Sequence, residues 1–230
     1  FYWSSIESIS IPSEVSLIGE SAFYGCNKLR QVKFPNDSKL RTIEKQAFNK
    51  SSIESIQIPK KVTKIKDHAF CGCTKLKKVE IPTDSELQMI GKYAFSETLI
   101  ENISIPSKVA VIGENAFTYC NKIRTIEIPN DSNLQIIEQE LISSSSIECF
   151  TIPSNVVEIK DGWCNETPKL IKINVFHDNK YFIMNENKVL FGKSNNKQEN
   201  YDRLIFGVRN IKTIKIPNFI EHICSFAFQK

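Results

Sequence analysis

Apolar and polar residues alternate along this chain in short segments, each of which ends at a proline. In the segment 76–81, Leu76, Val79 and Ile81 are apolar, and every residue between them is charged. Alternation over the last three residues predicts a strand that buries one face and leaves the other in solvent. Pro82 has no N–H for a ladder hydrogen bond, so we expect the strand to end before it.

The same arrangement returns at intervals that alternate between 23 and 24 residues. The prolines that mark these intervals are Pro12, Pro35, Pro59, Pro82, Pro106, Pro129 and Pro153. Because the two spacings alternate, the chain is a repeat array in which the full unit is a pair of coils.

Within each coil we expect two further elements after the proline. One is a short extended segment that points Ile65 inward, and the other is a helical turn that carries Ala69 and Phe70. Asp67 is a good residue to start such a turn, and Gly72 is a good residue to end it. The equivalent phenylalanines should stack in one interior column formed by Phe23, Phe48, Phe70, Phe95 and Phe117.

Coils of roughly 20–29 residues with this strand pattern are typical of leucine-rich-repeat solenoids. The prediction is an α/β fold, a horseshoe or superhelix with one parallel β-sheet and a short helical turn in each coil of 23–24 residues. A parallel β-helix is the alternative, and it would lack the helical turn. We expect one solenoid over residues 1–230, and the absence of a polar cap at either end favours a piece of a longer array.

The repeat departs from its pattern after Pro153. Trp163 stands where small residues and phenylalanine occur in other coils, and we expect it to fill the space of a neighbouring ring. Residues 176–210 form an irregular insert in which two segments, 180–184 and 189–191, indicate a hairpin. The remaining expectations are a turn at 185–188, a polar loop at 193–200, a third strand at 201–206 and a resumed repeat at 211–217.

Composition narrows the functional classes. Of 230 residues, 41% are hydrophobic, which is enough for a continuous core, and the net charge is only +4. Basic residues are interleaved with acidic ones, which argues against a nucleic-acid surface. No segment approaches the roughly 18 consecutive apolar residues of a membrane span, so we expect no membrane insertion.

The seven cysteines are interpreted as core residues. Cys26, Cys73 and Cys120 occupy one repeat position, and strands two coils apart are separated by about 10 Å. That distance is too long for a disulfide, so these thiols are expected to be unpaired and buried.

No catalytic, cofactor or metal site is predicted. His68, His177 and His222 are scattered, and His68 should lie exposed in solvent at a helical position. Motifs for zinc proteases, phosphate-binding loops and serine hydrolases are missing. Asp37 and its equivalents Asp84 and Asp131 form a column, which we interpret as turn capping because calcium needs six to eight converging oxygens.

The exposed sheet face is the candidate binding surface. Residues that precede the strands alternate in charge and predict a ladder that fixes the register, which we favour over a charged binding stripe: Glu7, Arg30, Glu54, Lys77, Glu101, Arg124 and Glu148. Beside this ladder, ten strand residues form the predicted protein-binding face: Gln31, Lys33, Ser55, Gln57, Lys78, Glu80, Asn102, Ser104, Thr125 and Glu127.

The coil I-P-x-x-V-x-x-I-G-x-x-A-F-x-x-C-x-x-L-x-x-V-x-I-P closely resembles the BspA-like leucine-rich repeat, as in residues 11–34. The resemblance covers essentially the whole chain. It implies a non-enzymatic interaction module of a cell-surface or secreted antigen, with a host matrix protein, a surface protein or a glycan as partner. The alternative is an intracellular scaffold that is not exported.

Overall fold

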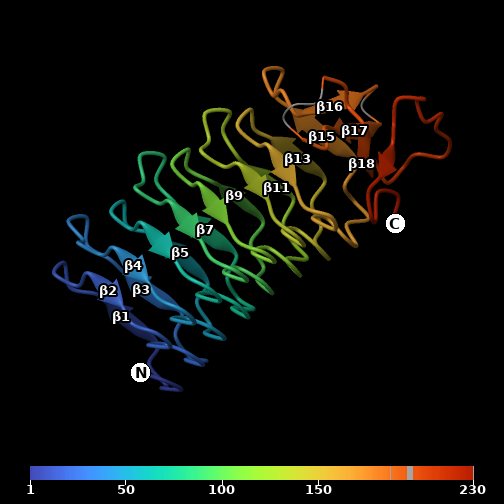
Figure 1. The fold of residues 1–230 in the computed structure, drawn as a ribbon. Helices are drawn as coiled ribbons and strands as arrows, with labels where there is room; N and C mark the ends of the chain where they lie inside the picture. Colours follow the sequence, from blue (N-terminus) through green and yellow to red (C-terminus); the bar gives the residue numbers. More distant parts are fainter. Residues whose placement is uncertain (187, 196–198, 230) are drawn as a thin grey trace.

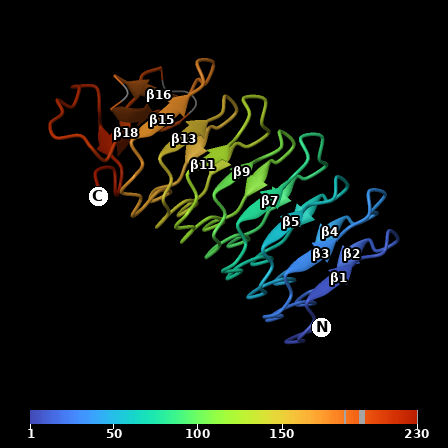
Figure 2. The ribbon, with the colours of Figure 1, turned by 180° about the vertical axis from the view of Figure 1, so that it is seen from behind.

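The computed structural model describes residues 1–186, 188–195 and 199–229. The coils stack one upon another into an elongated solenoid, with the two termini at opposite ends (Figure 1). Seen from behind, the coils keep the same order along the axis (Figure 2). Parts of the predicted 185–188 turn and 193–200 loop lie outside the described residues.

Each regular coil contributes one strand of three or four residues to a parallel sheet face. Its inward residues pair along the axis, as Ile56 does with Val79, while residues on either side point to solvent. Backbone pairing between the strands is interrupted between β7 and β9, so the face consists of two four-stranded sheets. The strands are β1 (Ser8–Ser10), β3 (Gln31–Lys33), β5 (Ser55–Gln57), β7 (Lys78–Glu80), β9 (Asn102–Ser104), β11 (Thr125–Glu127), β13 (Cys149–Ile152) and β15 (Lys172–Val175).

The extended segments after the prolines form a second parallel face, which consists of a five-stranded and a two-stranded sheet. In the larger sheet Ile43 pairs with Ile65 and Ile65 with Ile90. These isoleucines are fully buried, so the core lies between two sheets. The strands are β2 (Leu17–Ile18), β4 (Thr42–Ile43), β6 (Lys64–Ile65), β8 (Met89–Ile90), β10 (Val111–Ile112), β12 (Ile136–Ile137) and β14 (Glu158–Ile159).

The predicted helical turn is wrong: the described residues contain no helix. In the segment 67–73, every second amide donates to the next coil instead of to its own, as Phe70 N does to Ala94 O at 2.8 Å. The amides between them close local turns, such as Cys71 N to His68 O at 3.2 Å. An α-helix would need all of these amides for its own carbonyls, so pairing between coils excludes it.

This turn segment depends on residues with positive φ at two repeat positions. In one coil His68 (φ 57°) and Gly72 (φ 68°) occupy these two positions. In the preceding coil Gln46 (φ 57°) and Lys50 (φ 57°) occupy them. Glycine adopts the left-handed region freely, whereas other residues are strained there and destabilise the fold. The predicted use of Gly72 as a left-handed residue is confirmed, although it ends a chain of turns and not a helix.

The interior phenylalanine column is confirmed. Phe23, Phe48, Phe70, Phe95 and Phe117 stack with ring centroids 5.0–5.7 Å apart and interplanar angles of 0–7°. The column ends at Phe117, because the next coil carries Ile142 at this position. Trp163 is buried and packs against Phe150 and Phe206, with centroids 5.1 and 6.0 Å away, so it does replace a neighbouring ring.

The insert also folds largely as predicted. Strands β16 (Phe182–Asn185), β17 (Val189–Gly192) and β18 (Arg203–Gly207) form an antiparallel sheet. The expected strand at 211–217 does not form, and β19 (His222–Ile223) resumes the parallel pairing on β18.

Truncation of a buried ring in the column should cost much of the stability of its coil. We expect Phe70→Ala, at a fully buried position, to lower the free energy of unfolding by about 3–5 kcal/mol, because it removes apolar contacts and leaves a cavity. Urea denaturation followed by circular dichroism measures this loss. A change as small as that of the exposed-site control Tyr119→Ala would contradict the column.

The left-handed position gives a second prediction. Gly72→Ala should lower the free energy of unfolding by about 1–2 kcal/mol, because alanine is strained at φ 68° and its Cβ would meet Lys50 Cγ at 3.2 Å. Gly19→Ala is the matched control, since no atom lies within 4 Å of the added Cβ. Equal melting temperatures of the two variants would show that the turn tolerates a side chain.

Candidate functional site

The ten predicted face residues lie in two straight rows across β3, β5, β7, β9 and β11. One row contains Gln31, Ser55, Lys78, Asn102 and Thr125, and the other contains Lys33, Gln57, Glu80, Ser104 and Glu127. All are exposed except Thr125, which is half-buried. The period-two alternation therefore identified the outward positions correctly, and we name these ten residues the outer sheet face.

The outer sheet face is only partly occupied by its own contacts. Six residues are joined in pairs: Lys78 with Glu80 (2.5 Å), Asn102 with Thr125 (2.6 Å) and Ser104 with Glu127 (2.5 Å). Within the described chain, the other four have no side-chain partner: Gln31, Lys33, Ser55 and Gln57. These four side chains can bond to a partner without breaking an existing contact.

Shallow clefts follow one another along this face. A cleft of about 700 Å³ lies at the interruption between β7 and β9, and Gln57, Lys78 and Asn102 line it. A second, of about 590 Å³, lies over β3, β5 and β7, with Gln31 and Lys33 in its lining. A third, also of about 590 Å³, includes Thr125. The outer sheet face is therefore hollowed along its length.

The predicted charge ladder is in register but mostly open. Lys77 N donates to Glu54 O at 3.0 Å, and Glu101 N donates to Lys77 O at 3.4 Å, so the alternating residues are neighbours. Among the seven ladder residues, all of which the structure describes, only Arg30 and Glu54 approach as an ion pair, at 4.0 Å. Exposed pairs contribute little in water, and here they do not neutralise one another by contact.

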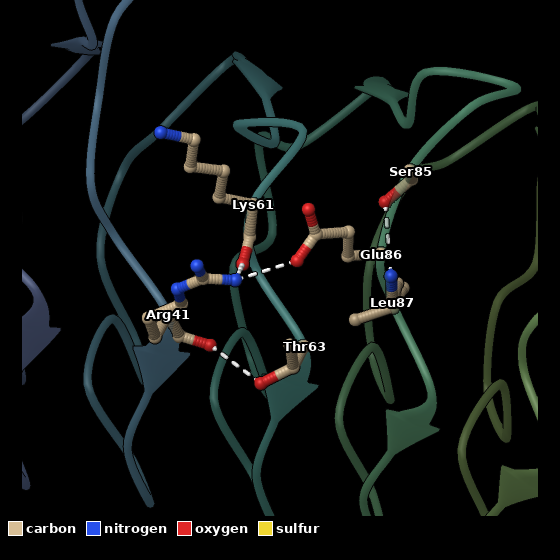
Figure 3. Close-up of polar contacts among 6 residues, drawn as sticks. All are labelled: Arg41, Lys61, Thr63, Ser85, Glu86 and Leu87. Carbon is tan, nitrogen blue, oxygen red and sulfur yellow. Dashed lines mark hydrogen bonds and ion pairs between the residues drawn. The ribbon is translucent and has the colours of Figure 1, made fainter.

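The aspartate column does not cap the turns as predicted. Buried serines do so, because Ser85 Oγ accepts a hydrogen bond from Leu87 N at 3.2 Å, as Figure 3 shows. Asp84 instead forms an ion pair with Lys60 at 2.5 Å. In the same loops Glu86 accepts from Arg41 at 2.5 Å (Figure 3), which ties together coils two apart.

Burial raises the pKa of six of the seven cysteine thiols, which makes them weaker nucleophiles at neutral pH. Burial raises the pKa of the Cys73 thiol to about 12 and that of Cys120 to about 11, which keeps both protonated. All seven cysteines are free, and Cys26 is buried with these two, as predicted. His68 is not the solvated residue that we expected. It stacks on Tyr93 at 4.8 Å between ring centroids, and burial lowers its pKa.

One cluster was not foreseen. Asp202, Glu221 and His222 each place a ligand atom within 4.8 Å of the others. No spacing in the sequence indicates it, because these residues meet only through the pairing of β18 with β19. Buried Asp202 already accepts a hydrogen bond from Ser194 N at 2.8 Å, and the other two are exposed, so we assign no ligand to the cluster.

The geometry defines a class, a parallel β-solenoid of leucine-rich-repeat type that exposes a polar face. The family model for the BspA-type leucine-rich repeat region matches residues 1–120 and 41–196, with six copies. The chain therefore belongs to the BspA-type leucine-rich repeat family, and the predicted resemblance is confirmed. A solenoid of this kind typically presents a binding surface and not an active site.

Solved structures share the fold. The pneumococcal vaccine antigen PcpA matches with a TM-score of 0.76 and 23% identity, over 96% of this chain and 52% of that one. A leucine-rich repeat protein from Eubacterium ventriosum gives 0.65 and 22%, over 80% and 46%. One from Bacteroides ovatus gives 0.64 and 19%, over 97% and 64%. The chain thus spans about half the length of the first two, and no curated protein matches it.

Among the described residues, none belongs to a helix with the length and apolar character needed to cross a bilayer.

The buried thiols make stability depend on pH. Since folding raises the pKa of Cys73 from 9.0 to about 12, its contribution is complete below pH 9 and is lost as the pH rises toward 12. We expect the free energy of unfolding to fall by up to about 1.4 kcal/mol per pH unit from this thiol. Cys73→Ala should show a flatter dependence in urea denaturation. An unchanged slope would mean that the thiol ionises equally well in the folded chain.

Proposed function

We propose that the chain is a non-enzymatic interaction module that binds a protein on the outer sheet face, in a cell-surface or secreted antigen. The observation that carries this proposal is the pair of straight rows of exposed side chains along consecutive clefts. A host matrix or surface protein is the partner that this extended, polar surface fits best. A glycan is a weaker candidate for this face, since no aromatic side chain is among its ten residues.

The energetics of the face favour many weak contacts. It lacks the tryptophan and tyrosine residues that dominate compact interfaces, so each coil should contribute little alone. Repetition compensates for this, because a partner that spans several coils binds the later ones at high effective concentration. Gln57, Lys78 and Asn102 lie at the centre of this arrangement, around the cleft between β7 and β9.

Location outside the cell is supported by the family and by a relative described as a vaccine antigen, a role that requires exposure to antibodies. A specific observation favours the alternative, an intracellular scaffold. All seven cysteines are free, as is usual where thiols are kept reduced. Antibody labelling of intact cells separates the two: staining without permeabilisation supports the surface location, and staining only after it supports the scaffold.

The interaction face can be tested with two matched variants. One replaces Gln57, Lys78 and Asn102 by alanine on the outer sheet face. The control replaces exposed Lys64 in β6 together with exposed Gln88 and Gln135, which directly precede β8 and β12, so each variant loses one lysine and two amides. Surface plasmon resonance against purified extracellular-matrix proteins measures binding.

We expect the face variant to bind at least tenfold more weakly, a loss of about 1.4 kcal/mol, and the control to bind as the natural chain does. Equal loss in both variants, or no loss in either, would exclude the outer sheet face. Binding to none of the matrix proteins by the natural chain would remove the matrix partner from the proposal.

A further inference from the structure

A second surface lies along the edge of the solenoid, where the turns lead into the long strands. In every second coil this edge carries cations at two fixed positions, repeated every 47 residues. We name as the strand-start edge its seven members: Lys28, Arg30, Lys75, Lys77, Lys122, Arg124 and Lys169. All seven are exposed. Coils along one side of the sheet are about 4.8 Å apart, so successive cation pairs lie about 10 Å apart.

These cations differ from those of the opposite edge in having few partners. On the loops after the strands, Lys39 pairs with Glu14 at 2.8 Å and Lys60 with Asp84 at 2.5 Å. On the strand-start edge, within the described chain, the only ion pair is Arg30 with Glu54 at 4.0 Å. Most of these seven cations therefore have their full hydrogen-bonding capacity free for a ligand.

The edge also has an excess of positive charge. Its seven cations alternate with four exposed carboxylates of the intervening coils, Glu7, Glu54, Glu101 and Glu148, which leaves three positive charges. Lys50, Glu97 and Glu166 lie one turn further from the strands and reduce this excess by one. The charge is arranged in discrete pairs, each separated from the next by a coil that carries one carboxylate.

A cleft is built into this edge. It encloses about 540 Å³, and four cations line it: Lys77, Lys122, Arg124 and Lys169. Two carboxylates, Glu101 and Glu148, also line it, together with Asn121 and Ser146. Lys169 Nζ donates to Ser146 Oγ at 3.4 Å, which positions that ammonium group at the rim. The cleft can hold one anionic group between its cations. The amide of Asn121 and the hydroxyl of Ser146 lie in the same cleft and can form hydrogen bonds with a sugar ring.

We propose that the strand-start edge binds a linear sulfated polysaccharide, with its sulfate groups on the cation pairs and its uncharged parts over the intervening carboxylates. Lysine ammonium groups bind such anions as point charges, and arginine does so with two hydrogen bonds. A single-stranded nucleic acid fits less well, because its bases stack on aromatic side chains. No aromatic residue lines the cleft. This surface adjoins the outer sheet face, because Lys77 and Asn102 line clefts of both. The two can still fail independently, because none of the seven cations is among the ten face residues.

The test uses the whole chain and size-defined heparin oligosaccharides in isothermal titration calorimetry. The edge variant changes Lys75, Lys77, Lys122 and Arg124 to glutamine, all of which are exposed, and therefore the fold should be retained. The control changes the same number of cations on the opposite edge: Lys39, Lys60, Lys61 and Lys108 to glutamine. Both variants have the same net charge, so any difference between them reports position.

We expect the edge variant to bind heparin at least tenfold more weakly, with a smaller salt dependence, and the control to change less than twofold. Longer oligosaccharides should bind more tightly until they span the edge, as multivalent contact requires. Equal weakening of both variants would overturn the proposal, because net charge alone would then explain binding. Tighter binding of single-stranded DNA than of heparin, or no heparin binding at low salt, would overturn it as well.

Discussion

The structure depends on hydrogen bonds between successive coils. Both sheets and the turn segment use the backbone of one coil to satisfy the backbone of the next, as in the bonds from Phe48 N to Ala69 O and from Phe70 N to Ala94 O, each 2.8 Å. A buried backbone group without a partner is costly, so a coil is stable only against its neighbours. This requirement fixes the length of each coil, since a register shift would break every bond at once.

Stacking at constant register converts repeat positions into columns. One column is the interior series of phenylalanines, and each inward strand position forms another. The same rule acts on the surface, where residues 47 positions apart come to lie two coils apart. Both surfaces proposed for binding are therefore rows of residues that run along the solenoid. A single exposed lysine does not indicate a binding site here, whereas a lysine at the same repeat position in every second coil forms a row of positive charge.

The inserted hairpin shows how the solenoid accommodates a change of pattern. β17 and β18 pair in antiparallel fashion, and β19 then pairs with β18 in parallel, so parallel stacking resumes on the insert. The core continues through it, because Phe206 packs against Trp163. The antiparallel strands thus replace one coil without opening the interior.

The sequence by itself determined which residues face inward, because the alternation of apolar and polar residues and the regular spacing of the prolines report burial directly. The phenylalanine column, the hairpin and the exposure of nine of the ten face residues followed from that. Tertiary structure decided what the polar groups do. The turn at His68 is not a helix, Ser85 and not Asp84 caps its loop, and the charge ladder stays largely open. Burial is fixed by local pattern, whereas the partner of a polar group depends on the neighbouring coil.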